Sequence, residues 1–394
     1  MKQVASTGNK GERIRSDCQV NLQVHEKGGI DIRLQSKVEP MFGEQIRQQA
    51  LEVLEVLGVG HARLEIEDSG ALPFVIGARI EAAVKQLQAT DRSWIPPLIE
   101  QNRYESSRER FRFSRLYLPG NSPSMMLNAG LHQPDGVILD LEDSVAPDRK
   151  AEARLLVRNA LSQVDFYGAE RMVRINQLPA GLEDLDVLIP QHLHMVLLPK
   201  CEHGSQVVEV AERIQAILKA HKQEREIFLM PIIESALGVE NAFEIASASD
   251  SVVAMAIGLE DYTADLGVKR TETGGESLYA RTRLVNACKA AGIQPIDSVY
   301  SDVENMEGLL QNVETSRSLG FEGMGCIHPR QVPVIRQAFV PTEDEIEKAS
   351  RIVEAFEEAE ARGAGVVALG SKMIDPPVVK RAQRTLDLAQ KLKS

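Results

Sequence analysis

One segment reveals the fold most directly: residues 136–143 read Gly-Val-Ile-Leu-Asp-Leu-Glu-Asp. An apolar run ends here in Asp140, Glu142 and Asp143. A strand without polar alternation is typical of a parallel sheet that is covered on both faces. Carboxylates just past such a strand are expected at the carboxyl end of the sheet, where barrel enzymes carry their active sites. The segment therefore predicts a buried strand with a functional site at its end.

The same pattern recurs from Phe113 onward. Eight short apolar runs alternate with amphipathic helical stretches, at residues 115–118, 136–139, 171–175, 195–198, 227–230, 252–257, 294–296 and 323–327. Strands that alternate with helices predict an α/β protein with a parallel sheet. Eight such units within roughly 250 residues favour a closed (β/α)8 TIM barrel over an open sheet. We expect residues 113–394 to form this barrel domain.

Residues 1–90 predict a separate, small α+β domain. Residues 20–24 and 30–34 alternate in polarity, and a turn-forming cluster at 25–29 separates them, which predicts a β-hairpin. Helical spacing of apolar residues predicts a helix over 41–57. A further alternating strand at 62–66 and a closing helix at 77–87 complete the unit.

Residues 91–112 have the composition of a connection between domains. Pro96 and Pro97 interrupt regular structure, and the residues after them are rich in charge. We expect a solvent-exposed linker with room for one short helix. Trp94, the one tryptophan of the chain, is expected to pack locally rather than to bind a ligand.

Composition narrows the class of protein. The chain has 394 residues, of which 43% are hydrophobic and 26% charged, and its formal net charge is −12. An acidic chain is poorly suited to bind nucleic acid or an anionic membrane surface. No run of about 18 apolar residues is present to span a bilayer. Four widely spaced cysteines predict reduced thiols and a cytoplasmic location.

Polar side chains collect at the ends of the predicted strands. Arg174 ends the third strand, while Glu234 and Asp261 follow the fifth and sixth. Each alone fits a helix cap or a salt bridge, but barrel geometry brings all of them to one mouth. Two carboxylates from adjacent strands favour Mg²⁺, which polarises the carbonyl of a bound 2-oxo or 2-hydroxy acid. Arg174 suits a substrate carboxylate. Three further residues follow strands: Lys200, Asp297 and His328.

The barrel segment resembles the citrate lyase beta chains, within the wider family of metal-dependent aldolases and malyl-CoA-type lyases. The matching segments are residues 114–121, 140–146, 173–176, 232–235, 258–262, 297–302, 328–331 and 370–375. The resemblance implies a Mg²⁺-dependent carbon–carbon lyase that cleaves a citryl thioester to oxaloacetate and an acetyl thioester.

The resemblance also implies roles for individual residues. Glu234 and Asp261 correspond to the Mg²⁺ ligands, and Arg174 to the arginine that binds substrate and assists catalysis. Asp375 corresponds to the catalytic acid/base, although it would equally suit an N-cap before Pro376. The further substrate-contacting candidates are Arg115, Glu142, Asp143 and Glu234 itself. In the family the segment carrying the acid/base reaches a neighbouring subunit, which implies a homo-oligomer, a trimer or hexamer.

The N-terminal segment resembles the citrate lyase gamma chain, an acyl carrier protein. The similarity lies at residues 15–17, 29–32, 42–46, 68–72 and 78–83. It implies that Ser16 carries phosphoribosyl-dephospho-CoA, and that an alpha chain, an acyl transferase, is a partner. The sequence departs from the usual Glu-Ser-Ser-Asp because Arg15 precedes Ser16.

Two other functions remain open from the sequence. One is a lyase for malyl-CoA or citramalyl-CoA with a non-functional carrier domain. The other is a carrier scaffold whose barrel only binds partners, against which the full set of site residues argues.

Overall fold

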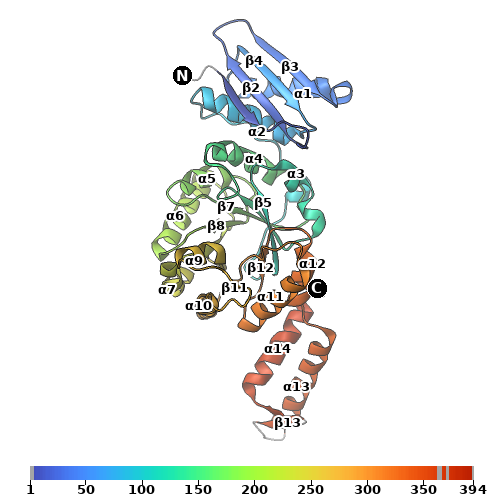
Figure 1. The fold of residues 1–394 in the computed structure, drawn as a ribbon, viewed down its shortest axis with the longest axis vertical. Coiled ribbons are helices and arrows are strands. Elements are labelled where there is room, and N and C mark those ends of the chain that lie inside the picture. The colour runs from blue at the N-terminus through green and yellow to red at the C-terminus, as the bar shows by residue number, and fades with distance from the viewer. Residues whose placement is uncertain (1–3, 362–365, 370–371, 393–394) are drawn as a thin grey trace.

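The computed structural model describes residues 4–361, 366–369 and 372–392. Gly370 and Ser371, which belong to the C-terminal motif, lie outside these described residues. Figure 1 shows three parts in a row: an N-terminal domain, a central barrel, and a helical hairpin on the opposite side. Within the described ranges, no helix combines the length and apolar character needed to cross a membrane.

The predicted eight-stranded barrel is confirmed. Its parallel strands run in the order β11-β10-β9-β8-β7-β6-β5-β12. A β-bridge between Asp297 and Met324 joins the two ends of the sheet. The strands are β5 (Ser114–Pro119), β6 (Gly136–Asp140), β7 (Glu170–Arg174), β8 (Met195–Leu198), β9 (Phe228–Ile233), β10 (Ala254–Ile257), β11 (Gln294–Ile296) and β12 (Met324–Cys326).

Helices cover the outside of this barrel. They include α3 (Pro123–Leu127), α4 (Lys150–Gln163), α5 (Gly181–Leu188), α6 (Gly204–Ala220), α7 (Ala236–Glu240), α8 (Ala242–Ala246), α9 (Leu259–Asp265), α10 (Leu278–Ala291), α11 (Met306–Leu319) and α12 (Gln331–Phe339). In β8, Met195 and Leu197 belong to the interior cluster, whereas Val196 and Leu198 belong to the cluster that includes helix residues. Both faces of the strand are thus buried, which explains its continuous apolar sequence.

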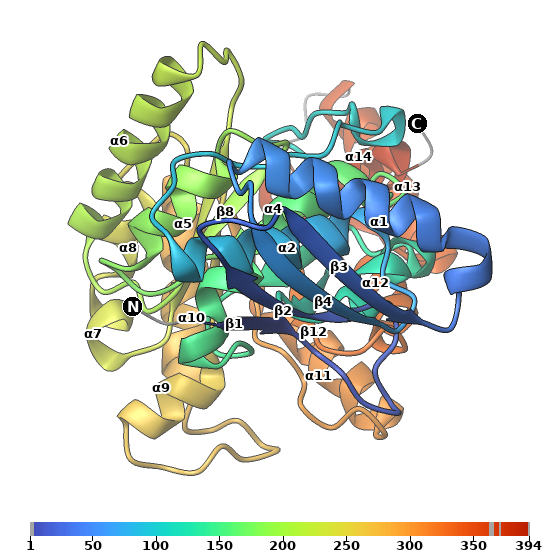
Figure 2. The ribbon, with the colours of Figure 1, turned by 90° about the horizontal axis from the view of Figure 1, so that it is seen from above.

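The N-terminal domain contains a mixed four-stranded sheet of order β1-β2-β4-β3. Its strands are β1 (Ala5–Gly8), β2 (Cys18–Val24), β3 (Ile30–Ser36) and β4 (Ala62–Asp68). Helices α1 (Glu39–Val56) and α2 (Pro73–Leu87) pack on this sheet, α1 beside β3 and α2 beside β1 and β2. Figure 2 shows this domain in front of the barrel.

The predicted hairpin between residues 20–24 and 30–34 is wrong. Strand β4 lies between β2 and β3, antiparallel to β2 and parallel to β3. Every second residue of β4 is buried and the rest are half-buried, whereas no residue of β3 is fully buried. The more buried strand therefore takes the inner position, and α1 provides the crossover that a parallel β3–β4 pair requires.

The segment 91–112, expected to be a solvent-exposed linker, is exposed over only part of its length. Trp94, Asn102 and Arg112 are buried, and the predicted short helix is a 3-10 turn, Glu100–Asn102. Trp94 packs locally as expected, against Gly77, where even a Cβ atom would lie 2.1 Å from the indole ring. Arg112 is neutralised by Glu170, with hydrogen bonds of 2.7 and 2.8 Å. Arg112 is thus a buried charge with a partner, whereas most of the other charged residues of the segment are exposed, as their composition predicts.

The C-terminal segment forms a hairpin of α13 (Glu343–Ala361) and α14 (Pro376–Lys391), joined through the short strands β13 (Val367–Leu369) and β14 (Lys372–Ile374). This hairpin projects from the barrel (Figure 1). Near the end of the chain, Leu388 and Leu392 pack against the barrel core. Along the two helices, the buried residues are Ala349, Ala359, Ala382 and Ala389.

Candidate active site

A cavity of about 440 Å³ lies at the carboxyl ends of the barrel strands. Five of the residues predicted from the sequence line it: Arg115, Asp143, Arg174, Glu234 and Asp261. The strand ends bring them together although they are up to 146 positions apart, from Arg115 to Asp261. The arrangement agrees with the expectation that polar residues past each strand converge on one mouth.

Arg174 is the centre of an acidic cluster. Its Nε and Nη2 atoms donate to the two carboxylate oxygens of Asp140, at 2.7 and 2.8 Å. Its Nη1 atom lies 2.8 Å from Glu142 and 3.4 Å from Asp143. Both edges of the guanidinium therefore contact carboxylates of the protein, and an anionic ligand would have to displace Glu142 or Asp143 from Nη1. The Tyr117 ring lies 5.5 Å from the guanidinium carbon.

Burial and charge shift the pKa values of this pair in opposite directions. Burial alone would lower the pKa of Arg174, but the hydrogen bonds and charge of Asp140 outweigh it and the pKa is raised. Burial would raise the pKa of Asp140, yet Arg174 lowers it below the ordinary value. Both groups are therefore charged at neutral pH.

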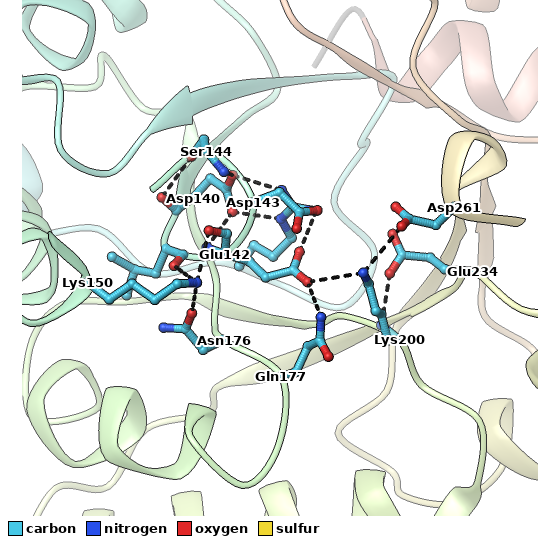
Figure 3. A network of polar contacts seen from close by, with 12 residues as sticks. Asp140, Glu142, Asp143, Ser144, Lys150, Asn176, Gln177, Lys200, Glu234 and Asp261 are labelled. Atoms are coloured by element: carbon cyan, nitrogen blue, oxygen red, sulfur yellow. Dashed lines mark hydrogen bonds and ion pairs between the residues drawn. The ribbon is translucent and has the colours of Figure 1, made fainter. Parts of the chain in front are cut away.

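Glu234 and Asp261 both contact Lys200, one through its amide and the other through its ammonium group. The Glu234 carboxylate accepts from the Lys200 amide at 2.9 Å, and the Lys200 ammonium lies 3.2 Å from Asp261. The same ammonium is 3.9 Å from Glu142 (Figure 3). Lys200 adopts a positive φ of 48°, which is uncommon for a residue with a side chain and is often found at functional sites. The bend directs the Lys200 amide to one carboxylate and its side chain to the others.

The acidic side chains of the mouth are incompletely neutralised. Burial, together with the nearby charges of Glu142 and Asp261, raises the pKa of Glu234 to about 7. Burial likewise raises the pKa of Glu142. Glu142 Oε2 is buried, and its neighbour is Arg174 Nη1 at 2.8 Å, a cation that Glu142 shares with Asp140 and Asp143. A cation placed among these carboxylates would remove much of this repulsion.

These residues fit a magnesium ion. Mg²⁺ is commonly held by one or two carboxylates, with water and substrate oxygens completing its coordination. Glu234 and Asp261 provide two carboxylates on one cavity. Among the described residues, no group of three or more His, Cys, Asp or Glu side chains is placed to hold a metal ion. A site completed by substrate is consistent with that donor set.

Arg115 lies on the wall of the same cavity and is 1% exposed. Its Nη1 atom contacts the Met230 sulfur at 2.9 Å, while Nε has no hydrogen-bond partner among the described residues. Burial lowers the pKa of Arg115 to about 10, so the guanidinium still carries its charge at neutral pH. A buried cation without a carboxylate partner is a candidate contact for an anionic substrate.

Three residues singled out from the sequence lie elsewhere or have other partners. Asp297 lines the cavity but pairs with Arg281 and contributes to barrel closure. His328 lines a different cavity, beside His132 and Arg336. Asp375 is absent from the residues that line the mouth of its own chain, and its side chain accepts from the Val378 amide at 3.2 Å as the N-cap of α14.

Sequence reasoning did not assign a role to Asp140, Tyr117 or Lys200. Asp140 and Lys200 were visible as polar residues after strands, but their partners depend on the closed barrel. Tyr117 is part of an apolar run, and no sequence signal indicated that its ring lies beside Arg174.

Ser16 lies in the N-terminal domain, half-buried, with a positive φ of 58°. Its amide donates to Ser69 O at 3.0 Å, and the Ser69 amide donates to Asp17 O at 2.9 Å. These two bonds fix the backbone on both sides of the serine. Within the described ranges its hydroxyl makes no hydrogen bond, which leaves it available for modification.

Comparison with known proteins identifies the barrel. Residues 114–329 match the family model described as HpcH/HpaI aldolase/citrate lyase. The chain belongs to this family. Residues 8–87 match an acyl-carrier model described as malonate decarboxylase delta subunit. The chain is thus a carbon–carbon lyase of the citrate lyase beta type, fused to an acyl-carrier-like domain.

Curated relatives cover most of the barrel and hairpin. The chain is 40% identical over 284 residues to the citrate lyase subunit beta of Haemophilus influenzae, which spans 71% of this chain and 98% of that protein. It is 33% identical to the mitochondrial citramalyl-CoA lyase of Homo sapiens, over 79% of this chain and 95% of the relative.

Solved structures show ligands in related barrels. A Mycobacterium tuberculosis protein in complex with magnesium, acetoacetate and coenzyme A has a TM-score of 0.61 and 30% identity, covering 72% of this chain and 100% of that one. The citrate lyase beta subunit of the same organism, complexed with oxaloacetate and magnesium, has a TM-score of 0.51 and 32% identity, covering 59% and 99%.

Proposed function

We propose that this chain cleaves a citryl thioester, carried on its own N-terminal domain, to oxaloacetate and an acetyl thioester in a Mg²⁺-dependent reaction. The observation that carries the proposal is an acyl-carrier domain in the same chain as a citrate-lyase-type barrel. Residues 1–90 would be the carrier, 91–112 the connection and 113–394 the lyase. Ser16 would carry phosphoribosyl-dephospho-CoA, and an alpha chain would exchange acetyl for citryl on that group.

Glu234 and Asp261 would hold the Mg²⁺ ion in the mouth. When bound, this ion supplies Lewis-acid polarisation of the substrate oxygens. Asp140 occupies the Nε–Nη2 edge of Arg174, so a substrate carboxylate would bind Nη1 in place of Glu142 or Asp143. Arg115, which lacks a carboxylate partner among the described residues, would bind a second carboxylate deeper in the cavity. Glu142 and Asp143, which contact Arg174, would limit how the substrate turns.

The reaction is a retro-Claisen cleavage. The substrate hydroxyl loses its proton, and the bond between the carbinol carbon and the carbon next to the thioester breaks. The electron pair of that bond forms the enolate of the acetyl thioester, which then takes up a proton at carbon. Asp375 is the proposed proton carrier, a role typically worth about 10²–10⁴-fold in rate.

Asp375 would act in the mouth of a neighbouring subunit. It caps α14 on the projecting hairpin and does not line the cavity of its own chain. We therefore propose a homo-oligomer, a trimer or hexamer, in which each hairpin completes the next site. Co-expressed Glu234→Gln and Asp375→Asn chains should recover activity that neither variant has alone. No recovery in a mixed oligomer would refute the shared site.

A second candidate is cleavage of free citramalyl-CoA or malyl-CoA. The similarity to citramalyl-CoA lyase and to an L-malyl-CoA/β-methylmalyl-CoA lyase supports it. The deciding experiment assays citryl, citramalyl and malyl thioesters with and without Mg²⁺, together with intact mass of the purified protein. Citryl cleavage with an adduct on Ser16 supports the first proposal. If the protein is unmodified and cleaves only citramalyl and malyl thioesters, the second function replaces the first proposal.

A further inference from the structure

The N-terminal domain is joined to the barrel by a buried, charged contact between α2 and α4. Nη1 and Nη2 of Arg158 on α4 donate to the Glu81 carboxylate on α2, at 2.9 and 2.7 Å. Side chains of both residues are at most 3% exposed. Removing one partner of such a pair leaves a charge buried without compensation, which is strongly unfavourable. The pair therefore fixes how the two domains fit together, because any other arrangement would leave one of the charges buried without its partner.

Apolar packing continues across the same contact. Phe74, Val75, Ala78 and Ala82 of α2 belong to one hydrophobic cluster with the barrel core. The side-chain amide of Asn159 on α4 also donates to Phe74 O at 3.0 Å. Separating the domains would expose this apolar surface to water, so hydrophobic burial adds to the ion pair.

The connecting segment holds the domains together rather than letting them move apart. Arg158 donates to Trp94 O at 2.8 Å, and the Trp94 amide donates to Glu81 at 3.0 Å. Asn102 donates to Leu161 O and Val164 O at the end of α4, at 3.1 and 2.8 Å. A tether bound along its length cannot serve as a flexible linker.

Hydrogen bonds connect the residue next to Ser16 to a loop at the mouth of the barrel. The adjacent Asp17 is buried and accepts two hydrogen bonds from Arg79, at 3.0 and 2.9 Å. Arg79 also donates to Asn121 O at 3.3 Å. Asn121 follows the carboxyl end of β5, two positions after Pro119, which lines the active-site cavity.

A second loop of the mouth contacts the same part of the domain. The Gly8 amide donates to Glu152 at 3.0 Å, and Arg149 donates to Gly8 O at 2.8 Å. Arg149 and Glu152 lie in the segment that follows β6 and begins α4. The loop that contains Ser16 is therefore fixed against the connections that follow β5 and β6. We name six residues the interface cluster: Asp17, Arg79, Glu81, Arg149, Glu152 and Arg158.

We infer that the carrier domain stays docked during catalysis and that the arm on Ser16 delivers its acyl group to the cavity of the same chain. This inference rests on the proposed function. The prosthetic arm moves while the domain does not. A tethered thioester then meets its cavity at an effective concentration on the order of mM, whatever the protein concentration. A transferase partner would have to reach the docked Ser16.

The test uses full-length protein with its arm charged with citrate, and a Glu81→Gln/Arg158→Gln variant that loses the buried pair. Single-turnover release of oxaloacetate should be first order and independent of protein concentration in the wild type. The variant should lose at least tenfold in this rate, while cleavage of free citryl-CoA stays within about twofold. The reversed pair, Glu81→Arg/Arg158→Glu, should recover part of the lost rate. Hydrogen exchange in α2 and α4 reports undocking.

Three results would overturn the inference. The first is a wild-type rate that rises in proportion to protein concentration, a measurement that stands even if the variant does not fold. The second is unchanged arm turnover in a variant whose exchange shows undocking. The third is turnover in a co-expressed mixture of arm-bearing Glu234→Gln chains and arm-free Ser16→Ala chains, because delivery would then be to a neighbour. Failure of the wild type to cleave free citryl-CoA would instead refute the proposed function.

Discussion

Two clusters of charged side chains lie only one loop apart and differ in how their charges balance. The interface cluster has three acids and three arginines, with Lys85 at its edge 3.6 Å from Glu81. The mouth cluster has five carboxylates in contact with two cations: Asp140, Glu142, Asp143, Glu234 and Asp261 around Arg174 and Lys200.

The charge balance of a cluster indicates whether its side chains stabilise the fold or bind a ligand. Balanced, buried ions mainly hold two parts of a protein in a fixed relation, because neither partner tolerates loss of the other. An excess of carboxylates, three of them buried (Asp140, Glu142 and Glu234), is unfavourable in the isolated protein, in line with the raised pKa of Glu234. Such an excess indicates a ligand that supplies positive charge. Four experiments test this contrast, from the largest expected effect to the smallest.

Glu234→Gln should have the largest effect. Removing one carboxylate from the mouth should lower kcat/KM for Mg²⁺-dependent thioester cleavage by about 10²–10³-fold, the range typical of losing one charge-stabilising group. Binding of Mn²⁺, followed by electron paramagnetic resonance, should weaken in parallel.

Glu260→Gln is the matched control for this change. Glu260 is the neighbour of Asp261 but pairs with Arg270 at 2.7 Å and is half exposed. Exposed ion pairs contribute little, so its activity should stay within about fivefold of the wild type. Equal losses in the two variants would contradict a specific cation site at Glu234.

Arg158→Met tests the interface cluster. It leaves Glu81 buried beside an apolar side chain, so the free energy of unfolding should fall by about 3–5 kcal/mol. Chemical denaturation measures this loss. Arg213→Met removes an exposed pair with Asp186, and it should lower the free energy of unfolding much less than Arg158→Met does. Similar losses in the two variants would mean that burial does not set the strength of the interface.

Acid should destabilise the protein through His194, a buried group beneath the 91–112 segment. Burial and the nearby Arg171 lower the pKa of His194 to about 3. The unfolded chain therefore binds a proton below pH 6.5 that the folded chain does not, and stability falls as pH falls. Between pH 7.5 and 5.5 the loss from this group should be about 1.4 kcal/mol.

His194→Asn removes the titrating imidazole. The free energy of unfolding of this variant should therefore depend less on pH than that of the wild type. The neutral ring makes two hydrogen bonds, accepting from the Arg171 amide at 3.0 Å and contacting Tyr104 O at 2.9 Å, so a lower overall stability is also expected. His25→Asn, at an exposed position, should keep the wild-type pH dependence. Parallel pH profiles for His194→Asn and the wild type would refute this account.

The same contrast explains what the sequence could and could not predict. All eight barrel strands were predictable because each is largely buried and contains a short apolar run between helical segments. The mouth residues followed, because parallel strands end at one side. Ion pairs between residues far apart in the sequence were not predictable. Arg158 and Glu81 are 77 positions apart, and Arg174 and Asp140 are 34 positions apart. The wrong hairpin has the same origin, because turn signals at 25–29 do not reveal that β4 inserts between its neighbours.

Lys200→Met should have the smallest effect, and its sign is informative. The Lys200 ammonium contacts Asp261 at 3.2 Å, so it competes with a divalent ion for that carboxylate. Both side chains are more than one-third exposed, and such a pair contributes about 0.2–1 kcal/mol, equivalent to a factor of about 1.4 to 5 in binding. Calorimetric titration with Mn²⁺ should therefore show tighter binding by that factor in the variant.

Lys150→Met is the control, because the Lys150 ammonium donates to the carbonyl oxygens of Leu141 and Glu142 rather than to a carboxylate. Its affinity for Mn²⁺ should equal that of the wild type. Weaker binding in Lys200→Met would mean that Lys200 helps to arrange the carboxylates rather than compete for them. The strained backbone at Lys200 would then serve mainly to direct its amide to Glu234.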